Sequence, residues 1–258
     1  MSVADDGGST GRLRQAFGIP APGDLRRCLV ALGDPQSVWA RSFEHRFDAG
    51  DLTGHPLGNL VIAGLAAATG DFTAALEEAG RLVGAVGRVL PATTEPVHLV
   101  AESDAGAVAG EVAVAQAGRI AAVGLVPRSA PAPVEAVEAI EAADQVVLGP
   151  GSLFTSVLAA SLVPDITDAI ARTAATRIYV CNLDVVERET AGFDVAAHVD
   201  ALCAHGVQPD VVLADPDALP IGHPAVPVVT ASLRAEGRRG HDERQLAKAL
   251  RDLLGWRA

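Results

Sequence analysis

The chain has 258 residues, of which 49% are hydrophobic, 20% charged and only 3% aromatic, and its formal net charge is −12. This length and apolar content can bury one large core, so we expect a single domain over residues 1–258. The negative charge, and the lack of a basic stripe with interleaved aromatics, argue against nucleic-acid binding.

No stretch reaches the roughly 18 uninterrupted apolar residues of a membrane span, and the acidic N-terminus does not read as a signal peptide. We therefore expect a soluble, cytoplasmic protein without a membrane partner. Cys28, Cys181 and Cys203 show no C-x-x-C spacing, which argues against disulfides and zinc. His198 and His205 have no third ligand at metal-site spacing, so no metal site is expected from the protein alone.

Helix and strand patterns alternate along the chain. The expected helices are Asp24–Leu32, Pro56–Ala68, Asp71–Leu90, Val134–Ala143, two that follow Ser152 and Pro164, Val195–His205 and Asp242–Leu254. The expected strands are Val97–Ala101, Ala107–Ala115, Arg119–Val126, Val146–Leu148, Arg177–Cys181, Asp210–Ala214 and Pro227–Thr230. Short turns join the first three strands, which we expect to be antiparallel. The pattern predicts an α/β fold: a three-layer, Rossmann-like, mostly parallel sheet with helices on both faces and a small antiparallel insertion.

The first candidate binding segment is the glycine-rich stretch of residues 4–12. Its candidate ligand-binding residues are Asp5, Asp6, Gly7, Gly8 and Ser9. The two aspartates could hold Mg²⁺ together with nucleotide phosphates, because hard carboxylate oxygens suit that ion. Alternatively, they cap the turn that follows.

The second candidate segment, residues 51–59, opens a strongly apolar helix. Between Pro56 and Thr69 the only polar side chain before the end of the helix is Asn59. Free N–H groups at a helix N-terminus attract phosphate or carboxylate, and Gly54, His55 and Asn59 are candidates to line such a site. The alternative is a capped core helix with one satisfied asparagine.

A third candidate segment follows the predicted strand at residues 145–148. Its candidates are Gly149, Gly151, Ser152, Thr155 and Ser156. Their backbone amides and hydroxyls collect at a strand's carboxyl end, where open α/β sheets bind ligands.

Three further candidates each allow two interpretations. Asp24 and Arg26 could orient a phosphate or form a local ion pair. Thr53 could line the pocket or cap the helix that starts at Pro56.

These segments resemble the CofD-like family, in its branch of YvcK-type gluconeogenesis factors. The matching stretches are residues 4–14, 22–26, 28–32, 47–65, 149–157, 162–164, 179–182 and 189–190. The resemblance adds Asn182 as a ligand-binding candidate. It implies either a non-catalytic regulator that binds a UDP-sugar such as UDP-N-acetylglucosamine and supports cell-envelope synthesis and cell shape, or a 2-phospho-L-lactate transferase. It also implies a homo-oligomer.

No residue stands out as a nucleophile or a general base, so the catalytic residues are left unassigned. Mg²⁺ bound with a nucleotide is the only cofactor considered. A dinucleotide of the NAD type is a weaker alternative ligand. We see no aromatic cluster that would stack a deazaflavin acceptor, which favours the regulator over the transferase.

The sequence also departs from the family pattern. Members normally carry a strand and a Gly-Gly-Gly-Thr-Gly loop upstream of the Asp-Asp-Gly-Gly motif. In this chain that motif is residues 5–8, almost at residue 1. We expect the upstream coding sequence to supply that strand in frame; otherwise the chain is a degenerate copy. Residues 183–188 replace a Thr-Gln-Pro-Gly run. Gly240 replaces an arginine before His241, and the nearest arginine is Arg239.

Overall fold

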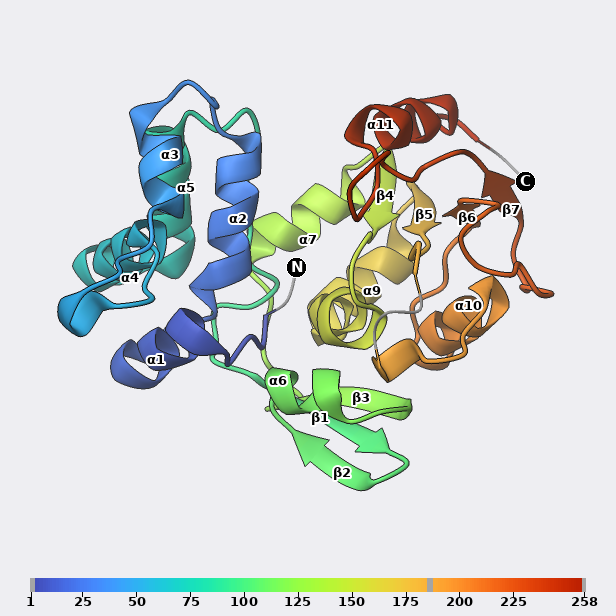
Figure 1. The fold of residues 1–258 in the computed structure, drawn as a ribbon, viewed down its shortest axis with the longest axis horizontal. Helices are drawn as coiled ribbons and strands as arrows, with labels where there is room; N and C mark the ends of the chain where they lie inside the picture. Colours follow the sequence, from blue (N-terminus) through green and yellow to red (C-terminus); the bar gives the residue numbers. More distant parts are fainter. Residues whose placement is uncertain (1–2, 185–187, 257–258) are drawn as a thin grey trace.

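The computed structural model describes residues 3–184 and 188–256. The run 183–188, where the sequence departs from the family pattern, therefore lies partly outside the described residues. Figure 1 shows a helical part, built from the first ninety residues, beside an α/β part built from the remainder.

The helical part has five α-helices, α1 (Gly8–Phe17), α2 (Pro22–Leu32), α3 (Val38–Glu44), α4 (Leu57–Thr69) and α5 (Phe72–Val83), and one short helical turn, η1 (Gly50–Leu52), between α3 and α4. Local chemistry sets several of their ends. The Asp71 side chain accepts the amides of Thr73 and Ala74 and so caps α5, which ends at the left-handed Gly84. The buried faces of all five helices form one hydrophobic cluster around Leu29, Phe43 and Ile62.

A four-stranded parallel sheet forms the centre of the α/β part, in the order β4-β5-β6-β7. Its strands are β4 (Gln145–Leu148), β5 (Thr176–Val180), β6 (Val211–Ala214) and β7 (Val228–Thr230). The connecting helical segments are α7 (Val134–Glu141), η2 (Leu153–Leu158), α8 (Ala159–Ser161), α9 (Pro164–Arg172), η3 (Arg188–Thr190), α10 (Val195–Ala204) and α11 (Glu243–Asp252). Helices cover both faces of this sheet: α9 and α10 belong to one hydrophobic cluster and α11 to another. The expected α/β layers are confirmed.

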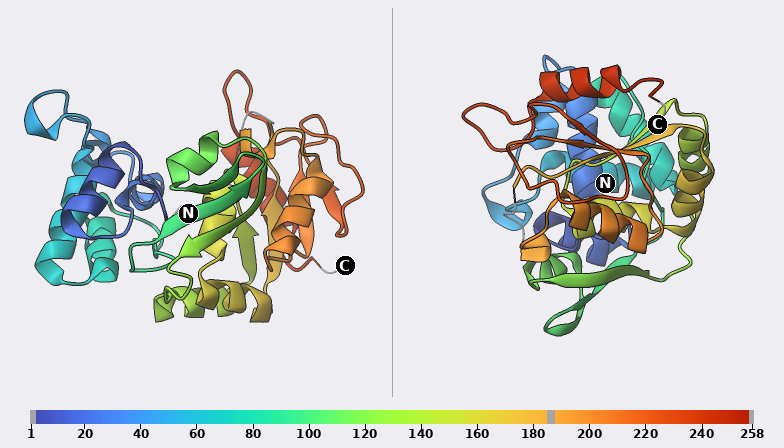
Figure 2. Two further views of the ribbon diagram at one scale, coloured as in Figure 1. Left: turned by 90° about the horizontal axis from the view of Figure 1, so that it is seen from below. Right: turned by 90° about the vertical axis from the view of Figure 1, so that its right-hand side faces the viewer.

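The small antiparallel sheet has the order β2-β1-β3 and packs into the same cluster as α9 and α10. It consists of β1 (His98–Ser103), β2 (Gly106–Ala109) and β3 (Ile120–Val126), with α6 (Glu111–Gln116) between the last two. Figure 2 shows it against the α/β part, on the side near α1.

Two helices were not foreseen, and two expected elements were wrong in part. The glycine-rich stretch starts a helix, α1, and α3 was not foreseen. The helix expected to reach Leu90 stops at Val83, because Gly84 adopts a φ of 69° and the chain turns away. The strand expected over residues 107–115 is a strand only to Ala109 and becomes α6 from Glu111.

Within residues 3–184 and 188–256, no single helix is both long and apolar enough to cross a membrane. Two consecutive segments, Leu153–Ser161 and Pro164–Arg172, reach that character only together and are bent by 80°.

Candidate functional site

A buried polar network joins the first and second candidate segments. The Nδ1 atom of His55 lies 2.8 Å from the Ser9 hydroxyl oxygen, and the Asn59 amide donates to that same oxygen at 3.2 Å. Burial, followed by the charges of Arg12 and Arg46, lowers the pKa of His55. Ser9 and His55 thus share one hydrogen bond, whose direction is set by the tautomer of the imidazole. Because Ser9 and His55 are each only 7% exposed, the pair holds α1 against α4 rather than presenting a nucleophile.

The amide group of Asn59 is only partly hydrogen-bonded. Its Oδ1 atom is buried and finds no hydrogen-bond partner among the described residues. Buried polar atoms without partners are rare in proteins. This atom is the part of the network best suited to receive a ligand donor.

Carboxylates gather beside this network. Asp5, Asp6 and Asp24 all lie within electrostatic reach of Glu111. The Asp6 carboxylate accepts the Val112 amide at 3.1 Å, which ties α6 to the N-terminal stretch. Burial, and after it the charges of the three aspartates, raises the pKa of Glu111 to about 7. This concentration of negative charge repels a bare phosphate.

Arg14 lies beneath the acidic group, with 8% of its surface exposed. Its guanidinium donates to the carbonyl oxygens of Ala4 (2.9 Å) and Asp5 (2.8 Å), and also to that of Val97. Burial lowers the pKa of Arg14, while the nearby charges of Asp6 and Asp5 raise it. All three acceptors are backbone atoms, so Arg14 links the helical part to the start of β1.

The structure changes the interpretation of three candidates. Arg26 is buried and donates to Glu44, at 2.6 Å, and to the Phe43 carbonyl oxygen. Asp24 forms its ion pair with Arg27, so the local Asp24–Arg26 pair considered above is wrong. Thr53 does not cap α4: its hydroxyl donates to the Gly50 carbonyl oxygen, and the N-cap of α4 is Pro56.

Gly54 lies in the turn ahead of α4. Its carbonyl oxygen accepts the Arg46 guanidinium at 2.6 Å, and its φ of 81° is one that glycine adopts readily. Arg12 donates to the carbonyl oxygen of Thr53, the residue before Gly54. Arg46 and Arg12 thus bind the carbonyl oxygens of residues 54 and 53. These hydrogen bonds hold the turn that leads into α4.

The third candidate segment lies at the carboxyl end of β4, as expected from its strand-to-helix pattern. Gly149 has a φ of 87°, and a Cβ there would lie 3.1 Å from the Val180 carbonyl oxygen, so the turn favours glycine. Thr155 is buried at 2% exposure. The amide of Phe154 at the start of η2 is already taken by the Glu189 carboxylate, at 3.0 Å. The Phe154 amide is therefore not available to a ligand.

A hollow of about 560 Å³ opens at the carboxyl ends of β4 and β5; we call it the carboxyl-end hollow. It is lined by Pro150, Gly151, Asn182, Leu183, Asp184, Arg239, Gly240, His241, Glu243 and Leu246. Burial lowers the pKa of His241, although its Nε2–H donates to the Cys181 carbonyl oxygen at 3.2 Å. The carboxylates of Asp184 and Glu243 are already paired, with Arg234 and Arg238.

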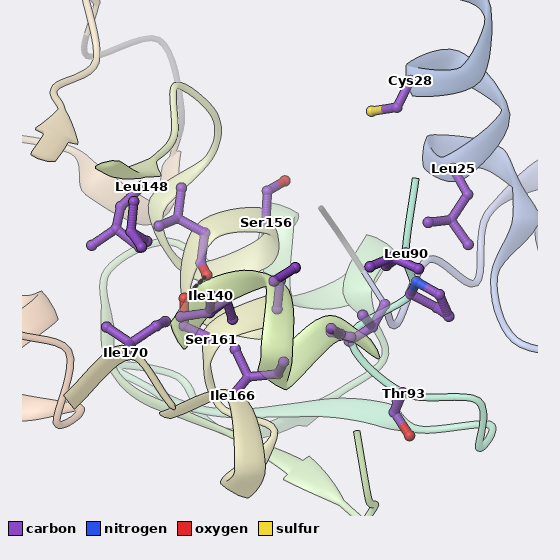
Figure 3. A pocket seen from close by; sticks show the side chains of 18 of the residues that line it. Leu25, Cys28, Leu90, Thr93, Ile140, Leu148, Ser156, Ser161, Ile166 and Ile170 are labelled. Carbon is purple, nitrogen blue, oxygen red and sulfur yellow. Dashed lines mark hydrogen bonds between the residues drawn. The ribbon is translucent and has the colours of Figure 1, made fainter. Parts of the chain in front are cut away.

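A second hollow, of about 570 Å³, runs along β4 between the helical and α/β parts; we call it the edge hollow. Figure 3 shows Leu25 and Cys28 of α2 on one side of it, and Leu148, Ser156 and Ile170 on the other. Pro150, just after β4, is in the lining of both hollows.

The structure separates the candidates into two groups. Asp5 to Ser9, Asp24, His55 and Asn59 gather between α1, α2, α4 and α6, whereas Gly149, Gly151, Ser156 and Asn182 line the hollows.

Sequence reasoning missed four residues that matter to these sites. Glu111 was placed in a strand, although the Gly110-Glu111 pair is a plausible helix start. Arg14 carried no local signal. Arg239 and His241 were noted only as a departure from the family pattern. Among the described residues, no group of three or more His, Cys, Asp or Glu side chains is arranged to hold a metal ion.

The model of the family described as 2-phospho-L-lactate transferase CofD matches residues 1–231. The chain belongs to the CofD family. Within the family, this chain is 42% identical to the gluconeogenesis factor of Halalkalibacterium halodurans over 219 residues, which cover 83% of the chain and 68% of the relative. It is 43% identical to the gluconeogenesis factor of Bacillus subtilis over 208 residues, which cover 80% of the chain and 66% of the relative. The expected resemblance to YvcK-type gluconeogenesis factors is confirmed.

A crystal structure of a UPF0052 family protein from Bacillus halodurans superimposes on this CofD family member with a TM-score of 0.90. The two sequences are 36% identical, and the match covers 96% of this chain and 88% of the other. A relative from Nostoc sp. is matched over only 48% of its length. The chain therefore spans between about half and two thirds of the curated relatives named here.

Proposed function

We propose that this CofD family member is a non-catalytic regulator that binds a nucleotide sugar, such as UDP-N-acetylglucosamine, and supports cell-envelope synthesis and cell shape as a homo-oligomer. The names of its relatives support the regulatory branch. The observation that carries the choice of ligand is the chemistry of the two hollows.

The carboxyl-end hollow suits a phosphorylated ligand. Its place beyond the carboxyl ends of parallel strands is where open α/β sheets bind nucleotides. Arg239 is exposed and forms no ion pair in the described structure, so its guanidinium can receive a diphosphate. The Asn182 amide N–H groups offer donors for a sugar or a base, while its Oδ1 accepts the Tyr179 hydroxyl at 3.3 Å.

The transferase alternative requires a pocket for a large planar acceptor. Neither hollow contains a Phe, Tyr or Trp side chain among its described lining residues. Aromatic side chains are the usual platform on which a flat ring system stacks. The lining therefore favours a nucleotide sugar over a deazaflavin.

Mg²⁺ is proposed only together with the ligand. Asp5 and Asp6 line neither hollow and supply too few protein ligands to hold the ion alone. They would hold Mg²⁺ only with a ligand whose phosphates extend to the N-terminal stretch and complete the coordination of the ion. A cation near them would also relieve the charge repulsion that, after burial, raises the pKa of Glu111. Mg²⁺ is therefore expected to raise the melting temperature with nucleotide sugar present and to leave it unchanged without it.

Thermal unfolding with UDP-N-acetylglucosamine tests the proposal. A ligand at a hundredfold excess over Kd stabilises the native state by about 2.7 kcal/mol, which the melting temperature reports. Arg239→Ala should weaken binding about tenfold, the value of one lost charged hydrogen bond. Arg244→Ala is the matched control, because Arg244 is also exposed but does not line the hollow.

A melting-temperature shift with GDP but none with millimolar UDP-sugar would contradict the proposal. Transfer of 2-phospho-L-lactate to a deazaflavin by the purified protein would replace it with the transferase.

A further inference from the structure

The small antiparallel sheet packs against the rest of the molecule through one face. Leu99 and Ala101 of β1 and Leu125 of β3 are buried in the same hydrophobic cluster as α9 and α10. In the left view of Figure 2 the three strands lie in front of the α/β part. Among the described residues, the groove on the opposite, outer face is lined only by the three strands and by Arg128, just after β3. The outer face is therefore open to a partner.

Strand register decides which residues form this outer face. Because strand side chains alternate, Val100 and Glu102 point away from the buried side of β1. Residues paired directly across two strands share a face. Two such rows therefore lie on the outer face: Ala109-Val100-Gly124 and Ala107-Glu102-Ala122. They line a groove of about 340 Å³, which we call the sheet-face groove.

Two opposite charges lie at the two ends of the sheet-face groove. Glu102 is near the turn between β1 and β2, whereas Arg128 follows β3 at the other end. From Ala122, the partner of Glu102, to Arg128 is six positions, or roughly 20 Å at the rise of a strand. Both side chains are exposed, and neither forms an ion pair within the described part of the chain. The rest of the groove lining is apolar.

This arrangement of charges is self-complementary. A two-fold axis that runs between two such faces, at right angles to the strands, reverses the strand direction in the second copy. Glu102 of each copy then lies over the partner's Arg128, so both charges are neutralised. A second copy thus supplies both counter-charges at the spacing that the groove requires. Between them, apolar rows of two sheets pack at the usual distance of about 10 Å.

The size of the face sets the strength of this contact. Three strands of this length cover roughly 300 Å² on each copy. A tight interface buries about 800 Å² per partner, so the contact is that of a weak, reversible dimer. In such a dimer the charge pairs fix the register and exclude other partners.

We propose that the outer face of the small sheet binds the same face of a second copy of this chain, with Glu102 of each copy paired to the partner's Arg128. This rests on the homo-oligomer of the proposed function and gives it a surface. It is independent of the nucleotide sugar, because Glu102 and Arg128 line neither the carboxyl-end hollow nor the edge hollow.

Sedimentation equilibrium of two charge-reversed variants tests the pairing. Glu102→Arg leaves two positive charges at each contact and Arg128→Glu leaves two negative ones, so each variant alone should dimerise at least tenfold more weakly than the wild type. An equal mixture of the two variants places opposite charges at both contacts, and it should recover the wild-type affinity as a heterodimer. High salt should weaken the wild-type dimer by screening both pairs.

Glu135→Arg and Arg251→Glu are the matched controls. Both residues are exposed, form no ion pair among the described residues and do not line the sheet-face groove, so these variants should dimerise like the wild type. Weakening by the controls as well, or no recovery in the mixture, would overturn the proposal.

Two further outcomes separate this proposal from the proposed function. A wild type that dimerises equally well with either charge reversed would overturn this surface and leave the homo-oligomer standing. A wild type that stays monomeric at every concentration would overturn both the surface and the homo-oligomer. Thermal shifts with UDP-N-acetylglucosamine on Glu102→Arg should match those of the wild type, so a failure of the ligand proposal appears in that measurement alone.

Discussion

At the residue scale, Asn59 is held by one hydrogen bond to Ser9 while its Oδ1 atom lacks a partner among the described residues. Asn59→Ala removes both the bond and the unpaired atom. The free energy of unfolding of the unliganded protein should therefore change by less than about 1 kcal/mol, while affinity for the nucleotide sugar falls. Urea denaturation and ligand titration on the same variant measure both. A loss of about 1–3 kcal/mol with unchanged affinity would make Asn59 a core amide only.

Glu111 provides a second residue-scale prediction. Its pKa in the folded protein, about 7, exceeds the ordinary value of 4.5, so the unfolded chain loses the proton first as pH rises. The wild type therefore loses stability between about pH 4.5 and pH 7, and Glu111→Gln does not. The variant should match the wild type near pH 4 and be more stable by on the order of 1 kcal/mol near pH 8, after allowing for solvent screening. Equal stability of the two proteins at both pH values would show that Glu111 ionises normally.

At the element scale, two glycines of α4 give a matched pair of tests. A Cβ on Gly58 would lie 2.7 Å from the Phe43 ring, so Gly58→Ala should push α4 away from α3 and cost about 1–3 kcal/mol. Gly64 has nothing within 4 Å of such a Cβ. Gly64→Ala should instead stabilise by about 1 kcal/mol through helix propensity. Chemical denaturation gives both values, and equal effects would contradict the close packing at Gly58.

The wrong prediction for α6 also belongs to the element scale. Val112 and Val114 alternate with smaller or polar residues, which is a strand pattern. The backbone nevertheless turns into a helix at Gly110, whose φ is 97°. The Asp6 carboxylate accepts the Val112 amide from 106 positions away, a stabilising contact that no local window contains.

At the scale of the whole molecule, Arg14 joins two parts with separate hydrophobic clusters. Arg14→Leu strands three carbonyl oxygens and should cost about 2–4 kcal/mol. The chain has two tryptophans: Trp39 lies in α3, and Trp256 packs against the α11 side of the sheet. If residues 1–258 form a single domain, the fluorescence changes of the two tryptophans coincide during urea unfolding of the wild type. In Arg14→Leu we expect the two transitions to separate.

Single-tryptophan variants, Trp39→Phe and Trp256→Phe, assign each signal. Separate transitions already in the wild type would show that the helical and α/β parts are distinct domains. Coincident transitions in Arg14→Leu would show that other contacts are enough to couple the unfolding of the helical part to that of the α/β part.

The sequence by itself determined the order and type of most elements. The parallel strands β4 to β7 and their helices follow from hydrophobic periodicity, and the caps of α5, α10 and α11 use aspartates adjacent to them in sequence. The turn at Gly149 could also be predicted, because the strand-to-helix pattern around it is local. Such features depend on interactions within a few residues.

Only the tertiary structure decided which side chains meet. Ser9 reaches His55 and Asn59 across 46 and 50 positions, and Glu189 caps η2 across 35 positions. Arg26 pairs with Glu44 instead of Asp24, and Glu111 joins the aspartates through a helix that the local pattern misassigned. These contacts depend on how distant segments close in space, and a local pattern carries no information about that closure. That β4 pairs with one strand, β5, within the described part of the chain has the same origin, because a strand's own residues do not reveal how many neighbours it will have.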